Sequence, residues 1–500
     1  MRRKYYMTQV LSVPLIVLGL LAAVPAAGEA ESARTRRVRD PNGESVVVAR
    51  IGEYRITRKD LEEQLQQDIR PDGYEEVVDD EPVTVEGTLR DMVAEKAMII
   101  EGRKLGYQDD EMIQASMKRF SEQQLTRALL NDYVGDHMPP APEAAAIDAL
   151  IKAHPKLGRE QAAALVRRQA IMRVVQQYYE GLLEKAEVKK DPENLAKAVE
   201  IHERLLRRPA EPRAKGQYWI KNSQVRDELS EEEKGLVLAT FKGGQFTLAD
   251  WFRALCDIVP PRRPTDLNTP QGVEKLLDQG LRTPILVAEA KARGYARNKE
   301  LQERIREVED QRVLWKAMSE ATADLKEPNE AEIKAFYEAH KEHFAEGPVL
   351  KVDEIWFRDK AAAEKARESL DTGAEFASVK KEYSLDKDRK PHPTSPAGEG
   401  PFWKALWKAD PNEVVGPVRG FYSDGVRWRV VKVIEKTPAK VQPYSEQMTD
   451  RVRSAMFAQR RAEALDSYRE KLLDEYPHKI FEDRIRGMDP LEIATKEGDG

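Results

Sequence analysis

The sequence is poor in the residues on which most redox, metal and nucleophilic chemistry depends. Its 500 residues hold one cysteine, Cys256, and seven histidines. A single cysteine excludes an intrachain disulfide, and because Cys256 lies in the apolar stretch WFRALCDIV, we expect it to fill a core. The sequence also lacks the P-loop, the dinucleotide-binding glycine pattern and the G-x-S-x-G motif. No cofactor is therefore expected.

Basic charge is scarce relative to acidic charge. Lys and Arg total 82 against 88 Asp and Glu, a formal net charge of −6, which argues against a nucleic-acid partner. Charged residues still make up 34% of the chain, a content typical of long solvated helices. His340 and His343 have no third ligand at a fixed spacing, so we interpret them as a solvated helix end and expect no metal site.

Long hydrophobic runs are missing except near the start of the chain. Residues 1–30 begin with a basic cluster, continue with an apolar run from Val10 to Val24, and end in the small residues of VPAAGEA. This is the layout of a secretory signal peptide, and the run is shorter than the ~20 residues that span a bilayer. We therefore predict a periplasmic or otherwise exported protein. An uncleaved N-terminal membrane anchor is the alternative.

Two stretches of the chain repeat one pattern at an offset of 190 residues. VVVARIGEYRITRKDL begins at Val46, and LVLATFKGGQFTLADW begins at Leu236. Each has a β-rich apolar run, a turn, a short strand that ends in threonine, and then a helix start. Thr57 and Thr247 are well placed as N-caps, because a hydroxyl there can accept a hydrogen bond from the first helical turn.

The match continues to two helix ends, RKLGY and KARGY. Gly106 and Gly294 predict these ends, because only glycine adopts the left-handed backbone of a helix stop without strain. A further helical pattern follows each glycine, over residues 111–134 and 299–320. The same order of elements twice in one chain indicates an internal duplication.

The order of these elements resembles the N-terminal helical chaperone module of the SurA and PrsA family of exported foldases. The stretch ARIGEYRITRKDL carries the resemblance best. The resemblance implies a first helical module over residues 46–207, a linker over 208–235 and a second helical repeat over 236–344.

The segment 345–438 resembles a parvulin-like, PpiC-type prolyl isomerase domain. VLKVDEIWF, GAEFASVKKEYSLD and PNEVVGPV occur in the order of the family's motifs. The resemblance implies peptidyl-prolyl cis-trans isomerase activity and a small antiparallel sheet flanked by helices. The predicted fold class is then α+β: a mainly helical duplicated module, this domain, a C-terminal helix within 439–485 that packs on the chaperone module, and a tail over 486–500.

The two histidines that the family uses for catalysis are replaced in this chain, whereas the acidic residue is retained as Asp386. Parvulins carry two histidines on neighbouring strands and a cysteine or aspartate nearby. At the matching positions this sequence has Glu354, Arg429 and Asp386, which are the catalytic candidates that the resemblance implies. Glu354 and Arg429 would form an ion pair between adjacent strands. Two interpretations stay open: the pair only holds the sheet, or Asp386 and Arg429 serve a rewired isomerase.

The slot that would hold a proline ring is also altered. Rotation about an X–Pro bond crosses a barrier of ~18–20 kcal/mol because the twisted amide loses resonance. A catalyst therefore needs an apolar slot for the ring and polar groups that favour the twisted amide. The family's M-x-x-x-F has no counterpart, and PAGEGPFW replaces G-G-D-L-G-x-F. Trp403, Leu406 and Trp407 are the candidate substrate-binding residues.

Three functions fit these observations. The first is an ATP-independent chaperone for unfolded envelope or secreted proteins, which binds extended polypeptide through apolar grooves. The second is an active isomerase with a rewired site, which refolding limited by proline isomerisation would reveal. The third is an assembly adaptor for one envelope partner, which the breadth of captured partners would reveal. We favour the chaperone with a degenerate isomerase domain; the sequence leaves the oligomeric state open.

Overall fold

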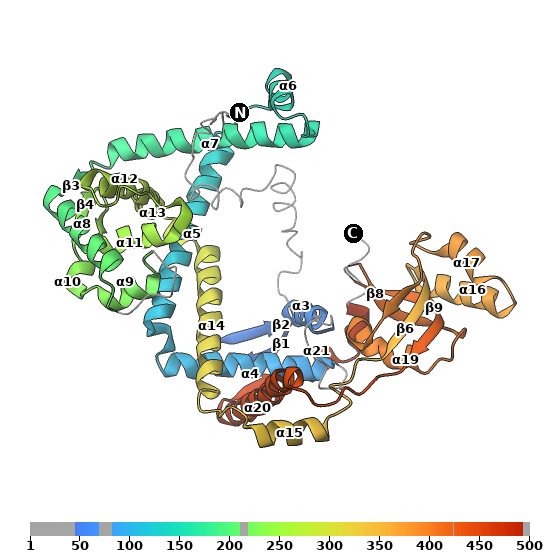
Figure 1. Cartoon of the computed structure of the whole chain (residues 1–500). Helices are drawn as coiled ribbons and strands as arrows, with labels where there is room; N and C mark the ends of the chain where they lie inside the picture. Colours follow the sequence, from blue (N-terminus) through green and yellow to red (C-terminus); the bar gives the residue numbers. More distant parts are fainter. Residues whose placement is uncertain (1–45, 70–82, 211–218, 424, 494–500) are drawn as a thin grey trace, which may run out of the picture. The chain divides into compact units, whose positions relative to one another are not determined.

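The computed structural model of the chain describes four stretches: residues 46–69, 83–210, 219–423 and 425–493. The predicted signal segment, residues 1–30, lies outside them. The described chain divides into two compact units (Figure 1). Unit 1 is Glu111–Glu309, and unit 2 consists of the described residues that precede and follow it. These boundaries differ from the module boundaries predicted at residues 207 and 344, because each unit combines elements from both copies of the repeat.

Unit 2 contains a helical part and the parvulin-like segment. The elements of the helical part are β1 (Val47–Ile51), β2 (Tyr54–Thr57), α3 (Arg58–Ile69), α4 (Val85–Lys104), η1 (Tyr107–Asp109), the second half of α14 (Lys299–Ala321), α15 (Glu330–Ala339), α20 (Glu446–Glu475), β10 (His478–Ile480), α21 (Glu482–Ile485) and α22 (Pro490–Ile493). The strands form an antiparallel sheet of order β10-β1-β2. Its core joins this sheet to α4 and α20, which lie side by side (Figure 1).

Unit 1 is helical around a second small sheet. Its elements are α5 (Glu111–Asp136), α6 (Ala144–Ala153), α7 (Arg159–Lys185), β3 (Lys189–Lys190), α8 (Pro192–Arg207), α9 (Asn222–Glu228), α10 (Glu231–Lys234), β4 (Val237–Phe241), β5 (Gly244–Thr247), α11 (Leu248–Asp257), η2 (Pro260–Arg262), α12 (Pro270–Gly280), α13 (Arg282–Ala292), η3 (Tyr295–Arg297) and the first half of α14. The sheet is antiparallel with the order β3-β4-β5. Its core includes the fully buried Trp251 and Phe252 of α11.

The two hairpins have the same register, as the repeat predicts. Val47 pairs with Thr57, and Val237 pairs with Thr247; a bulge follows at the same place in each hairpin. Thr57 and Thr247 cap the helices that follow, because each hydroxyl accepts a hydrogen bond from the backbone N–H three residues on, at 3.2 and 3.3 Å. The predicted caps are therefore confirmed.

The two glycines behave alike as well. Gly106 follows α4 with φ 79°, and Gly294 follows α13 with φ 84°. Each is followed by one 3-10 turn, η1 or η3, and then by a long helix, α5 or α14. The predicted helix ends are confirmed, and the duplicated character of the helical part is shown by the geometry as well as by the sequence.

The repeat also includes two helix ends that the sequence analysis missed. VQQYYEGLLEK closes α7, and LDSYREKLLDE closes α20. Tyr178 matches Tyr468, and Leu182 matches Leu472, at an offset of 290 residues. The offset exceeds the 190 of the hairpins because the parvulin-like segment lies between α14 and α20, whereas only α6 lies between α5 and α7.

The two copies exchange elements within the chain. In the first half, β3 follows α7 but pairs with β4 of the second half; in the second half, β10 follows α20 but pairs with β1 of the first half. Likewise α5, which follows Gly106, packs on α13 in unit 1, and α14, which follows Gly294, contributes Val313 and Ala317 to the core of unit 2. Each unit is therefore built from both halves of the chain.

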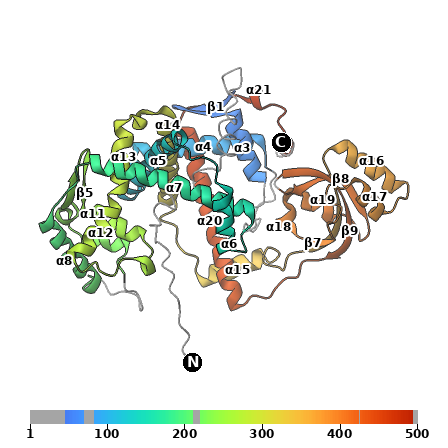
Figure 2. The same ribbon diagram turned by 90° about the horizontal axis from the view of Figure 1, so that it is seen from above.

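The parvulin-like segment is a four-stranded antiparallel sheet with helices on both faces. Its elements are β6 (Val349–Phe357), α16 (Lys360–Asp371), α17 (Phe376–Tyr383), β7 (His392–Thr394), α18 (Pro396–Glu399), η4 (Gly400–Phe402), α19 (Trp403–Trp407), β8 (Val414–Tyr422) and β9 (Gly425–Thr437). The strand order is β7-β6-β9-β8. Two apolar clusters form: one beneath α16 and α17, which lie together in Figure 2, and one beneath α19. The predicted α+β fold class is confirmed.

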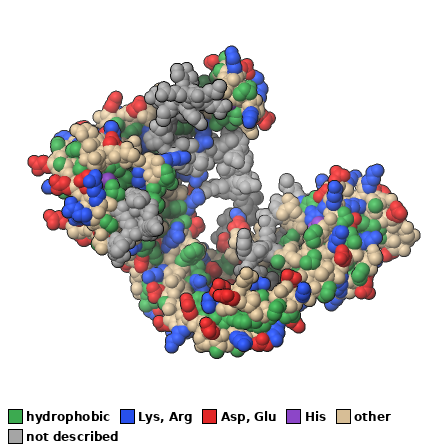
Figure 3. All heavy atoms as spheres, in the orientation of Figure 1, with side chains coloured by type: hydrophobic (Ala, Val, Ile, Leu, Met, Phe, Trp, Pro, Cys, Tyr) green, Lys and Arg blue, Asp and Glu red, His purple; other side chains and the backbone are tan. Residues whose placement is uncertain are grey.

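The described chain has no membrane-spanning helix, a folded C-terminal turn and a surface of mixed charge. Among the residues that the structure describes, no helix combines the length and apolarity that crossing a membrane requires. The predicted tail over 486–500 begins within ordered structure, since α22 forms a helical turn and buries Ile493. Acidic and basic side chains are interspersed on the face drawn in Figure 3, in keeping with the near balance of charges.

Candidate functional site

The parvulin-like sheet brings the two histidine-position residues together on one face. Successive side chains of a strand point to opposite faces. Ile355 and Phe357 of β6 pack beneath α16 and α17, so Glu354 and Trp356 point to the opposite face. Arg429 of β9 lies directly opposite Trp356 in the strand register, and its guanidinium donates a hydrogen bond to the Glu354 carboxylate.

A second carboxylate completes the arrangement. Arg429 also pairs with Glu399, at the end of α18: Nη2 makes the closer contact, and Nη1 lies 3.4 Å from Oε1. Glu354 in turn accepts a hydrogen bond from the Trp356 indole Nε1 at 3.1 Å and forms an ion pair with Arg389 at 3.0 Å. The result is a network of two carboxylates and two guanidinium groups, here called the Arg429 network.

The Arg429 network is almost completely withdrawn from solvent. The exposed fractions are 1% for Glu354, 2% for Arg429 and 4% for Glu399. Burial by itself lowers the pKa of Arg429, but the charges of Glu399 and Glu354 outweigh this effect and raise the pKa above its ordinary value. The guanidinium carbon also lies 5.0 Å from the ring centroid of Trp356. The buried charges therefore depend on one another for the interactions that replace water.

Gly420 of β8 makes room for the guanidinium. A Cβ atom added at this position would lie 2.2 Å from Nε and 2.3 Å from Cζ of Arg429. Real non-bonded atoms do not approach so closely, so any side chain here would displace the arginine. Gly420 is thus a residue that the Arg429 network requires, although φ at this position needs no glycine.

Asp386, the third catalytic candidate, does not join this network. It is half-buried, and its backbone carbonyl accepts a hydrogen bond from the Ser384 hydroxyl at 3.0 Å. Among the residues that the structure describes, its carboxylate makes no hydrogen bond or ion pair. The structure therefore brings Glu354 and Arg429 together and leaves Asp386 apart; a catalytic role for any of the three stays a prediction.

The three candidate slot residues lie beneath α19 and take part in the apolar packing. Leu406 is fully buried in the cluster that includes Val352 and Val431. Trp403 and Trp407 are half-buried against the same cluster, with their rings stacked at a centroid distance of 5.2 Å. Their predicted role in substrate binding stays a prediction.

The chemistry of this face follows from its charges. A prolyl isomerase gains rate only from groups that interact more strongly with the twisted amide than with the planar one. Here the polar groups at the histidine positions already bind each other, so a substrate carbonyl would have to break a buried ion pair to reach them. Breaking such a pair costs about 3–5 kcal/mol, which is a large part of the stabilisation that a catalyst would have to supply.

Sequence reasoning missed two members of the network, Glu399 and Arg389, and the indole of Trp356 that donates a hydrogen bond to it. Glu399 comes from PAGEGPFW, the stretch that replaces the family's glycine-rich loop, and Arg389 comes from the preceding loop. Trp356 shares a strand face with Glu354 because the two are two residues apart. A buried arginine next to one glutamate indicates further acceptors, and an acidic residue in the replaced loop was the signal available for Glu399.

The histidine pair and the single cysteine have ordinary structural surroundings. His340 and His343 stack at a centroid distance of 5.6 Å, and no group of side chains within the described ranges is arranged to hold a metal ion. Cys256 is half-buried with its Sγ 3.9 Å from the Ile220 carbonyl oxygen, and burial raises the pKa of its thiol. A raised pKa keeps the thiol protonated and unreactive.

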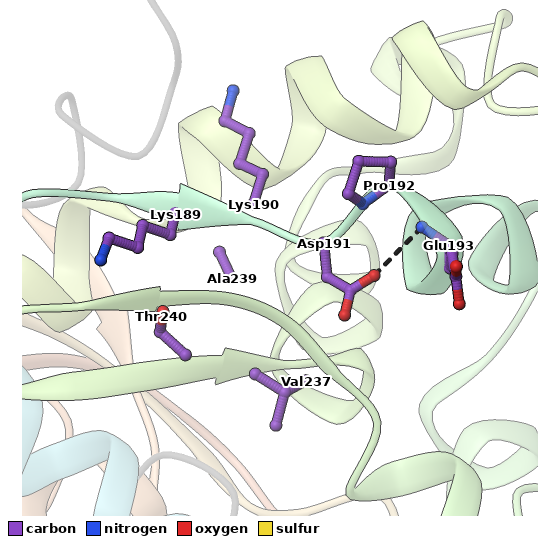
Figure 4. Close-up of a pocket in the computed structure, with 8 residues that line it drawn as sticks. All are labelled: Lys189, Lys190, Asp191, Pro192, Glu193, Val237, Ala239 and Thr240. Atoms are coloured by element: carbon purple, nitrogen blue, oxygen red, sulfur yellow. Dashed lines mark hydrogen bonds between the residues drawn. The ribbon is translucent and has the colours of Figure 1, made fainter.

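A hollow of about 520 Å³ lies along β3 and β4 in unit 1 (Figure 4). One of its two carboxylates, Asp191, caps α8 by accepting hydrogen bonds from the backbone N–H groups of Glu193 and Asn194, both at 3.0 Å. The hollow is therefore explained by a helix cap beside a short edge strand.

Comparison with known proteins follows the same division of the chain. The sequence model of the PPIC-type PPIase domain matches residues 328–447. Foldase protein PrsA 3 of Bacillus anthracis is 27% identical over 134 residues, which are 26% of this chain and 45% of that protein. Foldase protein PrsA of Caldanaerobacter subterraneus is 26% identical over 193 residues, 35% of this chain and 59% of that protein. This chain therefore spans about half the length of the curated relatives that it matches.

Solved structures that this chain matches include a SurA-like chaperone of Campylobacter jejuni, at 13% identity and a TM-score of 0.24, with 48% of this chain and 97% of that chain covered. Another is the foldase protein PrsA of Streptococcus pneumoniae, at 15% identity and a TM-score of 0.24, with 50% and 86% covered. Scores this low carry no argument on their own. The matched PPIC-type domain and the matched PrsA sequences nevertheless confirm the predicted resemblance: the chain is similar to PrsA foldases and carries a PPIC-type domain within residues 328–447.

Proposed function

We propose that this protein is an exported, ATP-independent chaperone that holds unfolded envelope or secreted polypeptides, and that its parvulin-like domain has lost most of its isomerase activity. The observation that supports the loss of isomerase activity is the Arg429 network. Its three most buried members occupy both histidine positions and the replaced loop, at 4% exposure or less.

The proposed chaperone function and export are supported by the similarity to PrsA foldases and by the export signal predicted at residues 1–30. The partners are then extended segments of unfolded polypeptide. Binding of this kind depends on burial of apolar surface, so it is weak at each contact and has little sequence preference.

Two measurements on the full chain test the proposal. In the first, aggregation of a chemically unfolded model protein is followed by light scattering without nucleotide. We expect suppression at a few equivalents of the chain, and no suppression at any ratio contradicts the chaperone function.

In the second, cis-trans exchange of a short proline peptide is measured by NMR. We expect no acceleration. Acceleration that disappears in Asp386→Ala but persists in Asp388→Ala, a neighbouring exposed aspartate, would show that a rewired isomerase is present and that the domain is not degenerate.

A further inference from the structure

Unit 1 has a cleft at a place that a tyrosine side chain fills in unit 2. The cleft has a volume of about 730 Å³ and is formed by one residue of α5, the last turns of α7, the turn between β4 and β5, and one face of α13 from Ile285 onward. The internal repeat gives every important position of this cleft an equivalent in unit 2, so the two places can be compared residue by residue.

Two equivalences matter most. Glu289 of α13 corresponds to Glu101 of α4, because each lies five residues before the glycine that ends its helix. Ala186, directly after α7, corresponds to Tyr476, directly after α20, because the matched helix ends precede both at the same distance. The acidic residue is thus kept, and the tyrosine is replaced by alanine.

In unit 2 this place is filled. The Tyr476 ring packs on the apolar core, and its hydroxyl donates a hydrogen bond to the Glu101 carboxylate. Lys104 lies over the ring, with Nζ 5.8 Å from the centroid. In unit 1 the positions of Tyr476 and Lys104 are taken by Ala186 and Ala292, both of which line the cleft. The cleft is therefore the space that a tyrosine and a lysine occupy in the other unit.

The lining of the cleft keeps the chemistry that a tyrosine needs. Leu182 and Ile285 are 8% and 4% exposed and form an apolar floor. Tyr178 stacks on Tyr133 at a centroid distance of 3.8 Å, which adds an aromatic wall. Glu289 remains as the acceptor for a phenolic hydroxyl; its own partner is Arg293, one turn away at 2.6 Å.

The charges around the opening of the cleft indicate which residues would flank a bound tyrosine in its peptide. Three basic residues, Lys185, Lys242 and Arg293, line the cleft with a single acidic residue, Glu289. In unit 2 the residue equivalent to Lys185 is Glu475, so the sign has changed at this position. A positively charged rim favours acidic residues on either side of the inserted side chain.

We propose that this cleft, the tyrosine cleft, binds a tyrosine side chain of an extended polypeptide segment with acidic flanking residues. Tyr476 in unit 2 is the internal example of the occupant. The inference rests on the proposed chaperone function for the source of such segments, and it assigns one sequence-selective site to a protein whose other contacts have little preference.

The test uses the full chain and three fluorescein-labelled peptides, in which Asp-Tyr-Asp, Asp-Phe-Asp or Asp-Ala-Asp is placed within a Gly-Ser sequence. Anisotropy titration should give saturable binding for the tyrosine peptide. Roughly tenfold weaker binding is expected for the phenylalanine peptide, because it loses one hydrogen bond to a charged acceptor, and the alanine peptide should not bind measurably. Equal affinity for tyrosine and phenylalanine would contradict the assigned role of Glu289.

Two variants close the cleft in different ways. Ala186→Tyr supplies the side chain that fills unit 2, and Gly181→Leu adds bulk where a Cβ atom meets nothing within 4 Å. Both should lose tyrosine-peptide binding at least tenfold. Lys471→Leu, at the position of unit 2 that corresponds to Gly181, is the matched control and should bind as the parent does. Binding that survives both closures overturns the proposal.

Aggregation suppression is measured on the same samples and separates this proposal from the proposed function. Suppression without tyrosine-peptide binding overturns the cleft and leaves the chaperone intact. Tyrosine-peptide binding without suppression supports the cleft and contradicts the chaperone. If sedimentation shows that Ala186→Tyr converts a dimer into a monomer, a second copy of the chain fills the cleft, and the proposal is wrong.

Discussion

Two places in this chain contrast with each other: one is filled by paired charges, and the other is an open cleft. In the parvulin-like domain, Glu354 and Arg429, at the predicted histidine positions, and Glu399, in the predicted replacement of the glycine-rich loop, fill the face with buried ion pairs. In unit 1, the positions of a tyrosine and a lysine of unit 2 hold Ala186 and Ala292, which leave a cleft of about 730 Å³. Charged side chains fill the first site, and short alanine side chains leave the second site open.

The difference teaches where binding capacity can reside in such a chain. The buried network uses most of its donors and acceptors internally, and the one Arg429 donor left without a hydrogen bond, Nε, is itself buried. An apolar cleft with one acidic residue and a basic rim has both surface and charge to offer a ligand. The match to a PPIase domain predicts binding at the parvulin-like face. The geometry favours binding at the cleft of unit 1.

The largest expected effect comes from removing Arg429. Arg429→Met leaves the carboxylates of Glu354 and Glu399 buried next to each other, and we expect a loss of about 3–5 kcal/mol in the stability of the parvulin-like domain. Hydrogen exchange of the full chain, read for peptides from β6 and β9, measures this loss.

The control for this variant replaces the three most buried members of the network and keeps Arg389. Glu354→Leu and Glu399→Leu, combined with Arg429→Met, remove all three buried charges, and similar buried triads are often neutral or stabilising when replaced by apolar residues. We expect the triple variant to recover most of the lost stability. If Arg429→Met alone costs under about 1 kcal/mol, as surface ion pairs do, the network is more hydrated than its burial indicates.

The second effect separates the two units by pH. His202 of α8 is 7% exposed and lies beside Trp251 of unit 1, and burial lowers its pKa to about 4. The unfolded chain binds a proton at this histidine near pH 6.5, before the folded chain does. Stability contributed by the neutral His202 is therefore present above pH 6.5 and is lost as the pH falls toward 4, by about 3 kcal/mol in total.

Unit 2 lacks such a group among its described residues, since no histidine there is buried. Hydrogen exchange at pH 7 and pH 4.5, corrected for intrinsic rates, should therefore show unit 1 losing more protection than unit 2. His202→Leu should remove most of the difference. An unchanged difference in this variant would assign the pH dependence to carboxylates instead.

The third effect tests how closely the parvulin-like face is packed. Gly420→Ala places a Cβ atom 2.2 Å from Nε of Arg429, so the guanidinium must move, and we expect a loss of about 2 kcal/mol from overpacking. Gly347→Ala is the matched control, because nothing lies within 4 Å of its Cβ position. Equal thermal unfolding of the two variants would mean that Arg429 can leave its place without cost.

Local signals predicted much of this architecture. The caps at Thr57 and Thr247 could be predicted because each threonine bonds to a residue only three positions later in the sequence. The helix ends at Gly106 and Gly294 could be predicted because they depend only on the backbone conformation of the glycine itself. The pairing of Glu354 with Arg429 followed from a family resemblance that aligned two strands. The α+β class followed from the same two sources of information.

The missed features depend on long-range relations. Glu399 lies 45 residues from Glu354 and reaches Arg429 only through the fold of the loop after β7. The exchange of β3 and β10 was hidden because the parvulin-like segment changes the repeat offset from 190 to 290 residues between the hairpins and the last helices. The cleft becomes visible only when the end of α7 is matched with the end of α20, so the sequence of one copy alone could not predict it.

The last prediction recreates the cleft in the other unit. Tyr476→Ala with Lys104→Ala gives unit 2 the residues that unit 1 has at these positions, and we expect a stability loss of about 1–2 kcal/mol, because the half-buried tyrosine ring and one hydrogen bond are lost. The binding stoichiometry of the tyrosine peptide should rise from one to two per chain. Tyr476→Phe, which keeps the ring in place, should stay at one. If the double variant folds and still binds one peptide, the cleft of unit 1 owes its binding to residues that the repeat does not share, such as Lys185 and Lys242, and charge rather than shape is what distinguishes the two units.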